Sequence, residues 1–169
     1  MRKLWLSLLI GIVAVSVGCS RGPAVEQKGP STPHGAKNEN HLVIEKTDMR
    51  FEVGQIKYFP EEMIPATEGQ TVVGIGVAVT NLNKQKPLKV DPKDFTITTD
   101  QGKTYSYSAE KTKITGKGAF LAGELTPDFR INGLILYEIP KNAKVKTIHY
   151  KDQAGHQLDI KMEDLPSGV

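Results

Sequence analysis

Alternating apolar residues along residues 69–81 limit the fold of this chain more than any other feature. Val73, Ile75, Val77 and Val79 occupy every second position, and smaller residues fill the positions between them. Successive side chains of a β-strand point to opposite faces of a sheet, whereas a helix buries residues three and four apart. The segment therefore predicts a strand whose heavy apolar face lies in the core.

Shorter alternating runs, separated by glycine, proline and polar residues, continue from His41 onward, and no apolar stripe of helical length interrupts them. The expected strands lie within 42–44, 49–58, 69–81, 95–99, 105–107, 131–139, 145–150 and 158–162. About seven to eight short strands over roughly 120 residues is the size of an immunoglobulin-like sandwich. We therefore predict an all-β, antiparallel β-sandwich for residues 41–169.

Several breaks in the pattern predict local structure. The apolar positions slip by one residue at Gly54, which is how a β-bulge appears in a sequence. Residues 100–102 and 152–155 have the composition of hairpin turns. Residues 81–92 and 111–118 are polar, and we expect both to be loops.

The segment after Pro127 has large apolar residues on both faces of the expected strand. Ile135 and Tyr137 share one parity, and Leu134 and Leu136 share the other. Strands that are apolar on both sides are usually covered on both sides, so this pattern predicts a central strand.

Gly74 and Gly76 lie on the light face of the strand predicted at 69–81. Glycines inside a strand cost stability and usually mark a close approach to the backbone. We expect an aromatic side chain from a neighbouring strand over this face, with a ligand or partner surface as the alternative.

The first eighteen residues predict export. Arg2 and Lys3 precede an apolar run from Leu4 to Gly18, which is shorter than the about 20 residues that a permanent span needs. A positive start, an apolar centre and small residues at the end are typical of a secretory signal peptide at residues 1–18.

Val17, Gly18 and Cys19 close this run, and they resemble the end of bacterial lipoprotein signals, although Ser16 replaces the usual aliphatic residue. Cys19 is the only cysteine of the chain. The resemblance implies a diacylglycerol on the Cys19 sulfur, cleavage before it, and attachment to a membrane through two acyl chains. An uncleaved signal anchor and a secreted soluble protein remain as alternatives.

Residues 19–40 are rich in glycine, proline and charge, and predict a flexible linker of about 25 Å average span. The formal net charge of +3 falls to 3 − 2 = +1 without Arg2 and Lys3. Lysines alternate with acids along the chain, so nothing predicts nucleic-acid binding. A single cysteine allows no internal disulfide.

His149, His156 and Asp152 are the strongest candidates for a metal or small-ligand site, because a hairpin turn at 152–155 would bring the three near one another. Two histidines at this spacing are not diagnostic of zinc, and no fourth ligand is evident. We expect the histidines to be solvated edge residues, and we assign no metal.

Asp91, Asp94 and Asp100 are a second acidic group. They lack the glycine and the bidentate glutamate of a calcium loop, so we expect them to act in turns and caps.

Motifs of catalysis and of nucleotide binding are incomplete in this sequence. Gly74-Ile75-Gly76 lacks the third glycine of a dinucleotide fingerprint, Gly102-Lys103-Thr104 lacks the first glycine of a phosphate loop, and no Gly-x-Ser-x-Gly occurs. We therefore predict no catalytic residues, no cofactor and no enzymatic activity, with an envelope hydrolase as an unfavoured alternative.

Two groups of lysines are expected to be ordinary solubilising surface, with anionic envelope polymers or lipid headgroups as the alternative ligands. They are Lys84, Lys86, Lys89 and Lys93, and Lys141, Lys144, Lys146 and Lys151.

Four stretches together resemble a known family. They are 69–81, 94–105, 125–127 and 133–140. They are similar to the telokin-like bacterial lipoprotein domain of unknown function, an immunoglobulin-like sandwich of YjhA-type surface lipoproteins. Asp128 stands where that family usually has a glycine. The resemblance implies a fold and a surface setting, and it brings no catalytic residues.

Taken together, the sequence predicts a lipoprotein held by Cys19 on the extracytoplasmic face of the cell membrane. Its sandwich would act as a non-catalytic binding module, with a protein or envelope polymer as partner. A metal- or small-ligand-binding extracytoplasmic sensor is the alternative.

Overall fold

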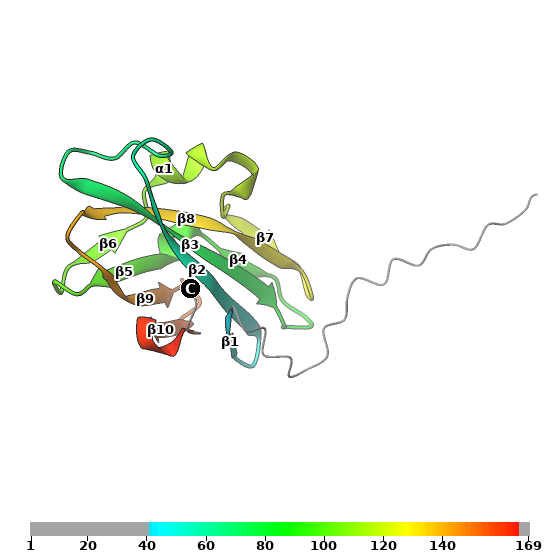
Figure 1. Cartoon of the computed structure of the whole chain (residues 1–169). Helices are drawn as coiled ribbons and strands as arrows, with labels where there is room; N and C mark the ends of the chain where they lie inside the picture. The colour runs from blue at the N-terminus through cyan, green and yellow to red at the C-terminus, as the bar shows by residue number, and fades with distance from the viewer. Residues whose placement is uncertain (1–40, 166–169) are drawn as a thin grey trace, which may run out of the picture. The chain divides into compact units, whose positions relative to one another are not determined.

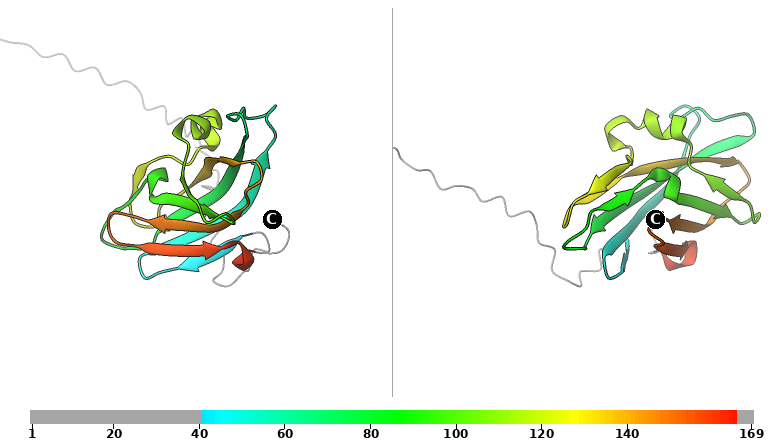
Figure 2. Two further views of the ribbon diagram at one scale, coloured as in Figure 1. Left: turned by 90° about the vertical axis from the view of Figure 1, so that its left-hand side faces the viewer. Right: turned by 180° about the vertical axis from the view of Figure 1, so that it is seen from behind.

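The computed structural model describes residues 41–165 (Figure 1). The signal peptide predicted at 1–18, the lipid site at Cys19 and the linker predicted at 19–40 lie outside these residues. The described part consists of two four-stranded antiparallel sheets and one two-stranded sheet, so the predicted all-β sandwich is confirmed. Figure 2 shows the two larger sheets as separate layers.

The first sheet has the order β1-β2-β3-β8, the second has the order β10-β9-β5-β6, and β4 pairs with β7 in the third. The strands are β1 (Leu42–Glu45), β2 (Met49–Phe59), β3 (Gln70–Asn81), β4 (Leu88–Val90), β5 (Phe95–Thr99), β6 (Thr104–Ser106), β7 (Gly123–Leu125), β8 (Arg130–Pro140), β9 (Val145–Lys151) and β10 (Gln157–Lys161). One α-helix, α1 (Ala109–Ile114), and the short 3-10 helices η1 (Pro92–Asp94), η2 (Gly116–Gly118) and η3 (Met162–Asp164) complete the described elements.

The core lies between the two larger sheets and follows the predicted alternation. All four valine and isoleucine residues of the heavy face of β3 are buried in it. Rings of Phe51, Phe95 and Tyr150 pack against one another, with the centroids of Phe95 and Tyr150 4.8 Å apart. Aromatic pairs at this distance add to the stability that burial alone supplies.

Local predictions at glycines are also confirmed. The register between β2 and β3 shifts between Val53 and Ile56, which places the bulge at Gly54. Gly102 and Gly155 have φ values of 75° and 92° in the β5–β6 and β9–β10 turns. These are left-handed conformations that glycine adopts without a steric penalty.

Gly74 has the close neighbour that the sequence predicts. A Cβ built on it would lie 2.6 Å from Cε2 of Phe59 on β2 and 2.7 Å from Cδ2 of Leu136. Phe59 belongs to a second small apolar cluster, on the outer face of the first sheet, with Ile64 and Val72. This face of β3 is therefore filled at Gly74 by an aromatic side chain.

Three expectations about the fold were wrong. β8 pairs with β3 alone and is an edge strand, not a central one. The segment 111–118, expected to be a loop, lies mostly within α1 and η2, and 81–92 contains β4. Together β4 and β7 raise the described strands to ten, beyond the seven or eight expected.

The outer face and the edge of β8 are covered by different segments, and its outer residue Leu136 packs with Ile64 and Val72. Ser108 N donates to Leu136 O at 2.7 Å, and Leu136 N donates to Thr112 Oγ1 at 3.0 Å. Phe120 N donates to Leu134 O at 2.9 Å. The segment around α1 thus covers the middle of the free edge of β8, at Leu134 and Leu136, and Figure 1 shows α1 beside that strand. A covered edge cannot pair with another chain.

Candidate functional site

The strongest candidate site lies at one end of the sandwich, where loops of both larger sheets meet β4 and β7. A cavity of about 620 Å³ opens there. We call it the mouth pocket, and its lining comes from Asp48, the 81–94 segment, residues 122–124 and residues 152–156. A volume of this size suits a small molecule or a few side chains of a partner, since such sites measure about 300 to 1,000 Å³.

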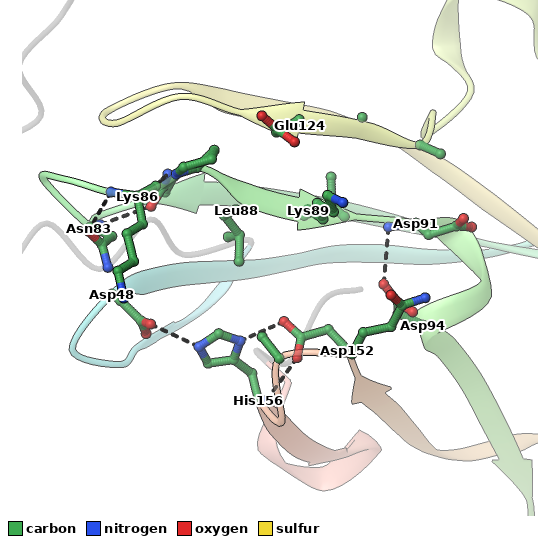
Figure 3. A pocket seen from close by; sticks show the side chains of 17 residues that line it. Asp48, Asn83, Lys86, Leu88, Lys89, Asp91, Asp94, Glu124, Asp152 and His156 are labelled. Carbon is green, nitrogen blue, oxygen red and sulfur yellow. Dashed lines mark hydrogen bonds and ion pairs between the residues drawn. The ribbon is translucent and has the colours of Figure 1, made fainter.

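His156 bridges two carboxylates in the mouth pocket (Figure 3). Its Nδ1 lies 2.5 Å from Oδ2 of Asp152, and its Nε2 lies 2.9 Å from Oδ2 of Asp48. Asp152 follows β9 in the turn that leads to His156, whereas Asp48 belongs to the β1–β2 turn of the other sheet. The ring therefore joins the two sheets.

Asp152 is held by its own hairpin and by the core. Its Oδ1 accepts from His156 N at 2.9 Å, and its Oδ2 accepts from the Tyr150 hydroxyl at 3.2 Å. Tyr150 is itself buried against the core aromatics. The side chain of Asp152 is only 3% exposed, so these partners fix its position firmly.

The pKa values of this pair move in opposite directions. Burial acts to raise the pKa of Asp152, but the hydrogen bonds and positive charge of His156 outweigh it and hold this pKa below its ordinary value. The hydrogen bond to Asp152 raises the pKa of His156, burial opposes this, and the bond to Asp48 adds to the rise. Each partner thus favours the charged form of the other.

Asp94 adds a further carboxyl group to the mouth pocket, beside those of Asp48 and Asp152. Burial raises the pKa of Asp94, the hydrogen bond from Asp91 N lowers it, and the charges of Asp91 and Asp152 raise it further. Asp91 caps η1 by accepting from Lys93 N at 2.9 Å, and Asp94 accepts from Asp91 N at 3.1 Å. The cap roles expected for these two aspartates are confirmed.

Asp100, the third member of the predicted acidic group, lies apart from the other two. Its Oδ1 accepts from Lys144 N at 2.9 Å in the β5–β6 turn region. Its predicted role in a turn is also confirmed.

Asn81 ties the wall of the mouth pocket together. It is fully buried, and its Nδ2 donates to Lys86 O and to Leu125 O, both at 2.9 Å, while its Oδ1 accepts from Asn83 N at 2.9 Å. One side chain therefore fastens the end of β3 to the β3–β4 connection and to β7. In the sequence Asn81 is only the last residue of the strand predicted at 69–81, and no local pattern indicates a role for its side chain.

The walls of the mouth pocket are partly apolar. Leu88 and Val90 of β4 are 7% and 2% exposed, and Ala122 and Ala154 are also part of the lining. Figure 3 shows Leu88 pointing from β4 toward the His156 side of the pocket. Apolar walls with a few fixed polar groups are typical of binding sites.

The structure does not bring His149 and His156 together. His149 lies on β9, where its Nδ1 is 2.6 Å from Asp159 Oδ1 and its Nε2 is 2.8 Å from Thr98 Oγ1. The two histidines share no partner, and within residues 41–165 no group of three histidine, cysteine or acidic residues is placed to hold a metal ion. The metal-binding alternative requires His149 to lie beside His156. That placement was wrong, because the register of β9 and β10 sets His149 opposite Asp159.

Asp48 was missed by the sequence analysis. It stands 108 residues before His156, in a turn with no motif around it. Its backbone carbonyl accepts from Leu82 N at 2.8 Å and from Asn83 N at 3.1 Å, which fixes the turn against the end of β3. No local sequence pattern could have found this contact.

The lysines of the two predicted groups lie in different environments, some in exposed ion pairs and some at the mouth pocket. Lys84 pairs with Asp128 at 2.5 Å and Lys141 with Glu61 at 2.7 Å, both in exposed positions, and Lys86 and Lys89 line the mouth pocket. Exposed pairs contribute little to stability.

None of the helices in residues 41–165 is long and apolar enough to cross a membrane.

Comparisons with known proteins place the chain in a family. The profile described as "Domain of unknown function (DUF4352)" matches residues 37–159, and the chain belongs to this family. Comparison with curated proteins found no match.

Several solved structures with a similar fold come from bacteria. The ycdA protein of Bacillus subtilis, a candidate lipoprotein, has a TM-score of 0.55 at 18% identity over 71% of this chain. The chain spans 38% of the length of that ycdA chain. The yjhA protein of the same species has a TM-score of 0.52 at 12% identity, with 71% of this chain and 95% of that chain covered.

The secreted protein MPT63 of Mycobacterium tuberculosis has a TM-score of 0.51 at 12% identity, with 72% of this chain and 91% of that chain covered. Identities this low establish the fold alone. The family and the yjhA likeness support a YjhA-type domain of unknown function, and none of these proteins brings an activity.

Proposed function

We propose that this protein is a lipoprotein of the extracytoplasmic face of the cell membrane and that its sandwich is a non-catalytic binding module whose contact surface is the mouth pocket. We also propose that the sandwich has a telokin-like arrangement. The anchor is proposed at Cys19 after removal of residues 1–18, with residues 19–40 as the linker. The sequence pattern there and the ycdA likeness support this setting.

The mouth pocket is the observation that carries the binding role. It joins partly apolar walls to charged groups fixed by hydrogen bonds, and Asp152 at its base is held by Tyr150 of the core. Pre-positioned polar groups bind a partner without a large entropic cost. With both contacts made, each ring nitrogen of His156 faces a carboxylate and neither faces a nucleophile, and this favours binding over hydrolysis.

Site-specific photo-crosslinking in membranes tests this proposal. Gln153 is exposed at the lip of the mouth pocket, and Ala109 is exposed on α1, outside the pocket. A photoreactive amino acid at position 153 of the full-length, membrane-bound chain should give a discrete adduct that is absent with the same amino acid at position 109. Identical adduct patterns at the two positions, or none at position 153, would contradict the proposal.

A small-ligand sensor is the second candidate, and the volume of the mouth pocket favours it. A ligand that binds only the folded state raises the melting temperature. The low-molecular-weight fraction of spent culture medium should then raise Tm of the full-length chain but leave Tm of Ala154→Trp, which adds a bulky side chain to the lining of the pocket, unchanged. Equal responses of the two proteins would remove this candidate.

A further inference from the structure

The two contacts of the His156 ring determine how many protons the ring must carry. A carboxylate oxygen only accepts hydrogen bonds, and a neutral imidazole carries a single N–H. His156 has carboxylate oxygens 2.5 Å from Nδ1 and 2.9 Å from Nε2. Both contacts are therefore hydrogen bonds only when the ring carries two protons.

His149 shows the contrast within the same protein. Its Nδ1 faces Asp159, but its Nε2 faces the hydroxyl of Thr98, which can donate as well as accept. A neutral ring with its proton on Nδ1 satisfies both partners. His149 therefore keeps its contacts in either state of protonation.

Loss of a proton from His156 would not weaken its two contacts equally. Asp152 is four residues away, lies in the same turn, and also accepts from the backbone N–H of His156. Asp48 is 108 residues away and meets His156 through this one side-chain contact. The remaining N–H would stay with Asp152, and a ring lone pair would then face the carboxylate of Asp48.

We propose that His156 is a proton-operated clamp between the two sheets: the protonated ring holds the Asp48 turn against the β9–β10 turn, and the neutral ring releases it and widens the mouth pocket beyond the about 620 Å³ that it has with the clamp engaged. The proposal rests on the proposed function only in treating this pocket as the binding site. The contact itself is an observed link between the sheets.

Charged groups face this cluster from every element around it. They are Asp48 of the β1–β2 turn, Asp152 with the Tyr150 hydroxyl of the β9–β10 hairpin, Asp91 and Asp94 of the η1 segment, Lys86 and Lys89 at β4, and Glu124 of β7. Acids outnumber lysines in this set. Within residues 41–165 no lysine lies within 4.0 Å of the carboxylates of Asp48, Asp94 or Asp152. The surroundings therefore favour the protonated ring.

The contact between His156 and Asp48 should break at a pH above 6.5, the ordinary pKa of histidine. The hydrogen bond to Asp152 raises the pKa of His156 above 6.5, so the ring is protonated in mildly acidic solution and loses its proton as the pH rises beyond that value. Mildly acidic surroundings would keep the mouth pocket at the size that the structure shows, and more alkaline surroundings would widen it.

A pH titration by NMR of the full-length chain in detergent micelles tests the clamp directly. Leu82 and Asn83 report on the position of Asp48, because their N–H groups donate to its carbonyl, and Leu88 reports on the pocket. The His156 ring should titrate with a midpoint above 6.5. The amide signals of Leu82 and Asn83 and the methyl signals of Leu88 should shift with the same midpoint.

Asp48→Asn is the matched variant, because an amide can accept from the N–H or donate to the lone pair of a neutral ring. In this variant the shared step at Leu82, Asn83 and Leu88 should disappear. His149→Gln should leave it unchanged.

A His156 midpoint at or below 6.5, or reporter signals that do not follow it, would overturn the proposal. These outcomes leave the crosslinking result untouched, and a failed crosslinking experiment leaves the titration untouched, so the two proposals fail separately.

Discussion

The imidazole of His156 and the carboxylate of Asp48 meet at 2.9 Å, although 108 residues separate them in the chain. Their contact joins the β1–β2 turn of one sheet to the β9–β10 turn of the other, at the end of the sandwich where the mouth pocket opens. Below this contact the Tyr150 hydroxyl donates to Asp152, which connects the polar cluster to the aromatic core. The cluster is therefore both part of the fold and the base of the candidate site.

The stability of the protein should pass through a plateau in mildly acidic solution. The raised pKa of His156 gives a contribution that is complete below 6.5 and is lost as pH rises through the folded-state value. The lowered pKa of Asp152 gives a contribution that is complete above 3.8 and is lost as pH falls through its folded-state value. Urea unfolding between pH 3 and pH 9 measures the profile, with both contributions present between about 4 and 6.5.

His156→Gln isolates the alkaline side of that profile. The variant lacks the titrating ring, so its free energy of unfolding should decline less between pH 6 and pH 9 than that of the wild type. His149→Gln serves as the control and should keep the wild-type slope. Equal slopes for the wild type and His156→Gln would show that the ring is not protonated in the folded state.

Gly74 and Gly76 of β3 should respond differently to the same substitution. Gly74→Ala places a methyl group 2.6 Å from Phe59 Cε2, and overpacking of this kind costs about 1 to 3 kcal/mol. Gly76→Ala meets only Gln55 O at 3.8 Å, an ordinary contact, and should be neutral or slightly stabilising. Chemical denaturation of both variants checks the contrast, and similar losses for the two would contradict it.

Removal of the Asn81 amide should destabilise the wall of the mouth pocket. Asn81→Ala leaves the buried Leu125 carbonyl and two further groups without their partner, and one such buried group costs about 1 to 3 kcal/mol. Asn83→Ala removes bonds made in exposed positions, to the amides of Gln85 and Lys86, and should cost less. Thermal unfolding compares the two, and a smaller loss for Asn81→Ala would be inconsistent with its described bonds.

Asp128 adopts a backbone conformation that favours glycine. Its φ of 64° is left-handed, in the turn where the family resemblance expects a glycine. A Cβ in this region costs about 1 to 2 kcal/mol, although aspartate tolerates it better than most residues. Asp128→Gly should therefore be more stable than Asp128→Ala by about 1 kcal/mol in urea unfolding. The exposed ion pair with Lys84 is absent from both variants, so it does not affect this comparison. Equal stabilities would mean that the turn relaxes to another conformation.

The sequence predicted the parts of the fold that local patterns encode. Alternation located the buried face of β3, a phase slip located the bulge at Gly54, and glycines located two hairpin turns. Each of these signals lies within a few residues, and each depends on side-chain direction or on backbone conformation.

The features that the sequence did not predict depend on contacts between residues that are far apart in the chain. The helix α1 has six residues, too few for a hydrophobic stripe, and its place on the edge of β8 depends on the bond from Leu136 N to Thr112 Oγ1. The apolar outer face of β8 predicted a central strand, but Leu136 on that face is covered because it packs with Ile64 and Val72, and not because β8 lies between two strands. In the candidate site, His156 and Asp152 were found because they share one turn, and Asp48 was missed because it does not.

The mass of the intact protein extracted from membranes tests the central claim most directly, because the proposed role requires a sandwich held outside the cell by Cys19. The account predicts a chain that begins at Cys19 and carries a diacylglycerol, with Cys19→Ser shifting the protein out of the membrane fraction. An unmodified chain that retains residues 1–18, or a Cys19→Ser variant that fractionates like the wild type, would contradict it.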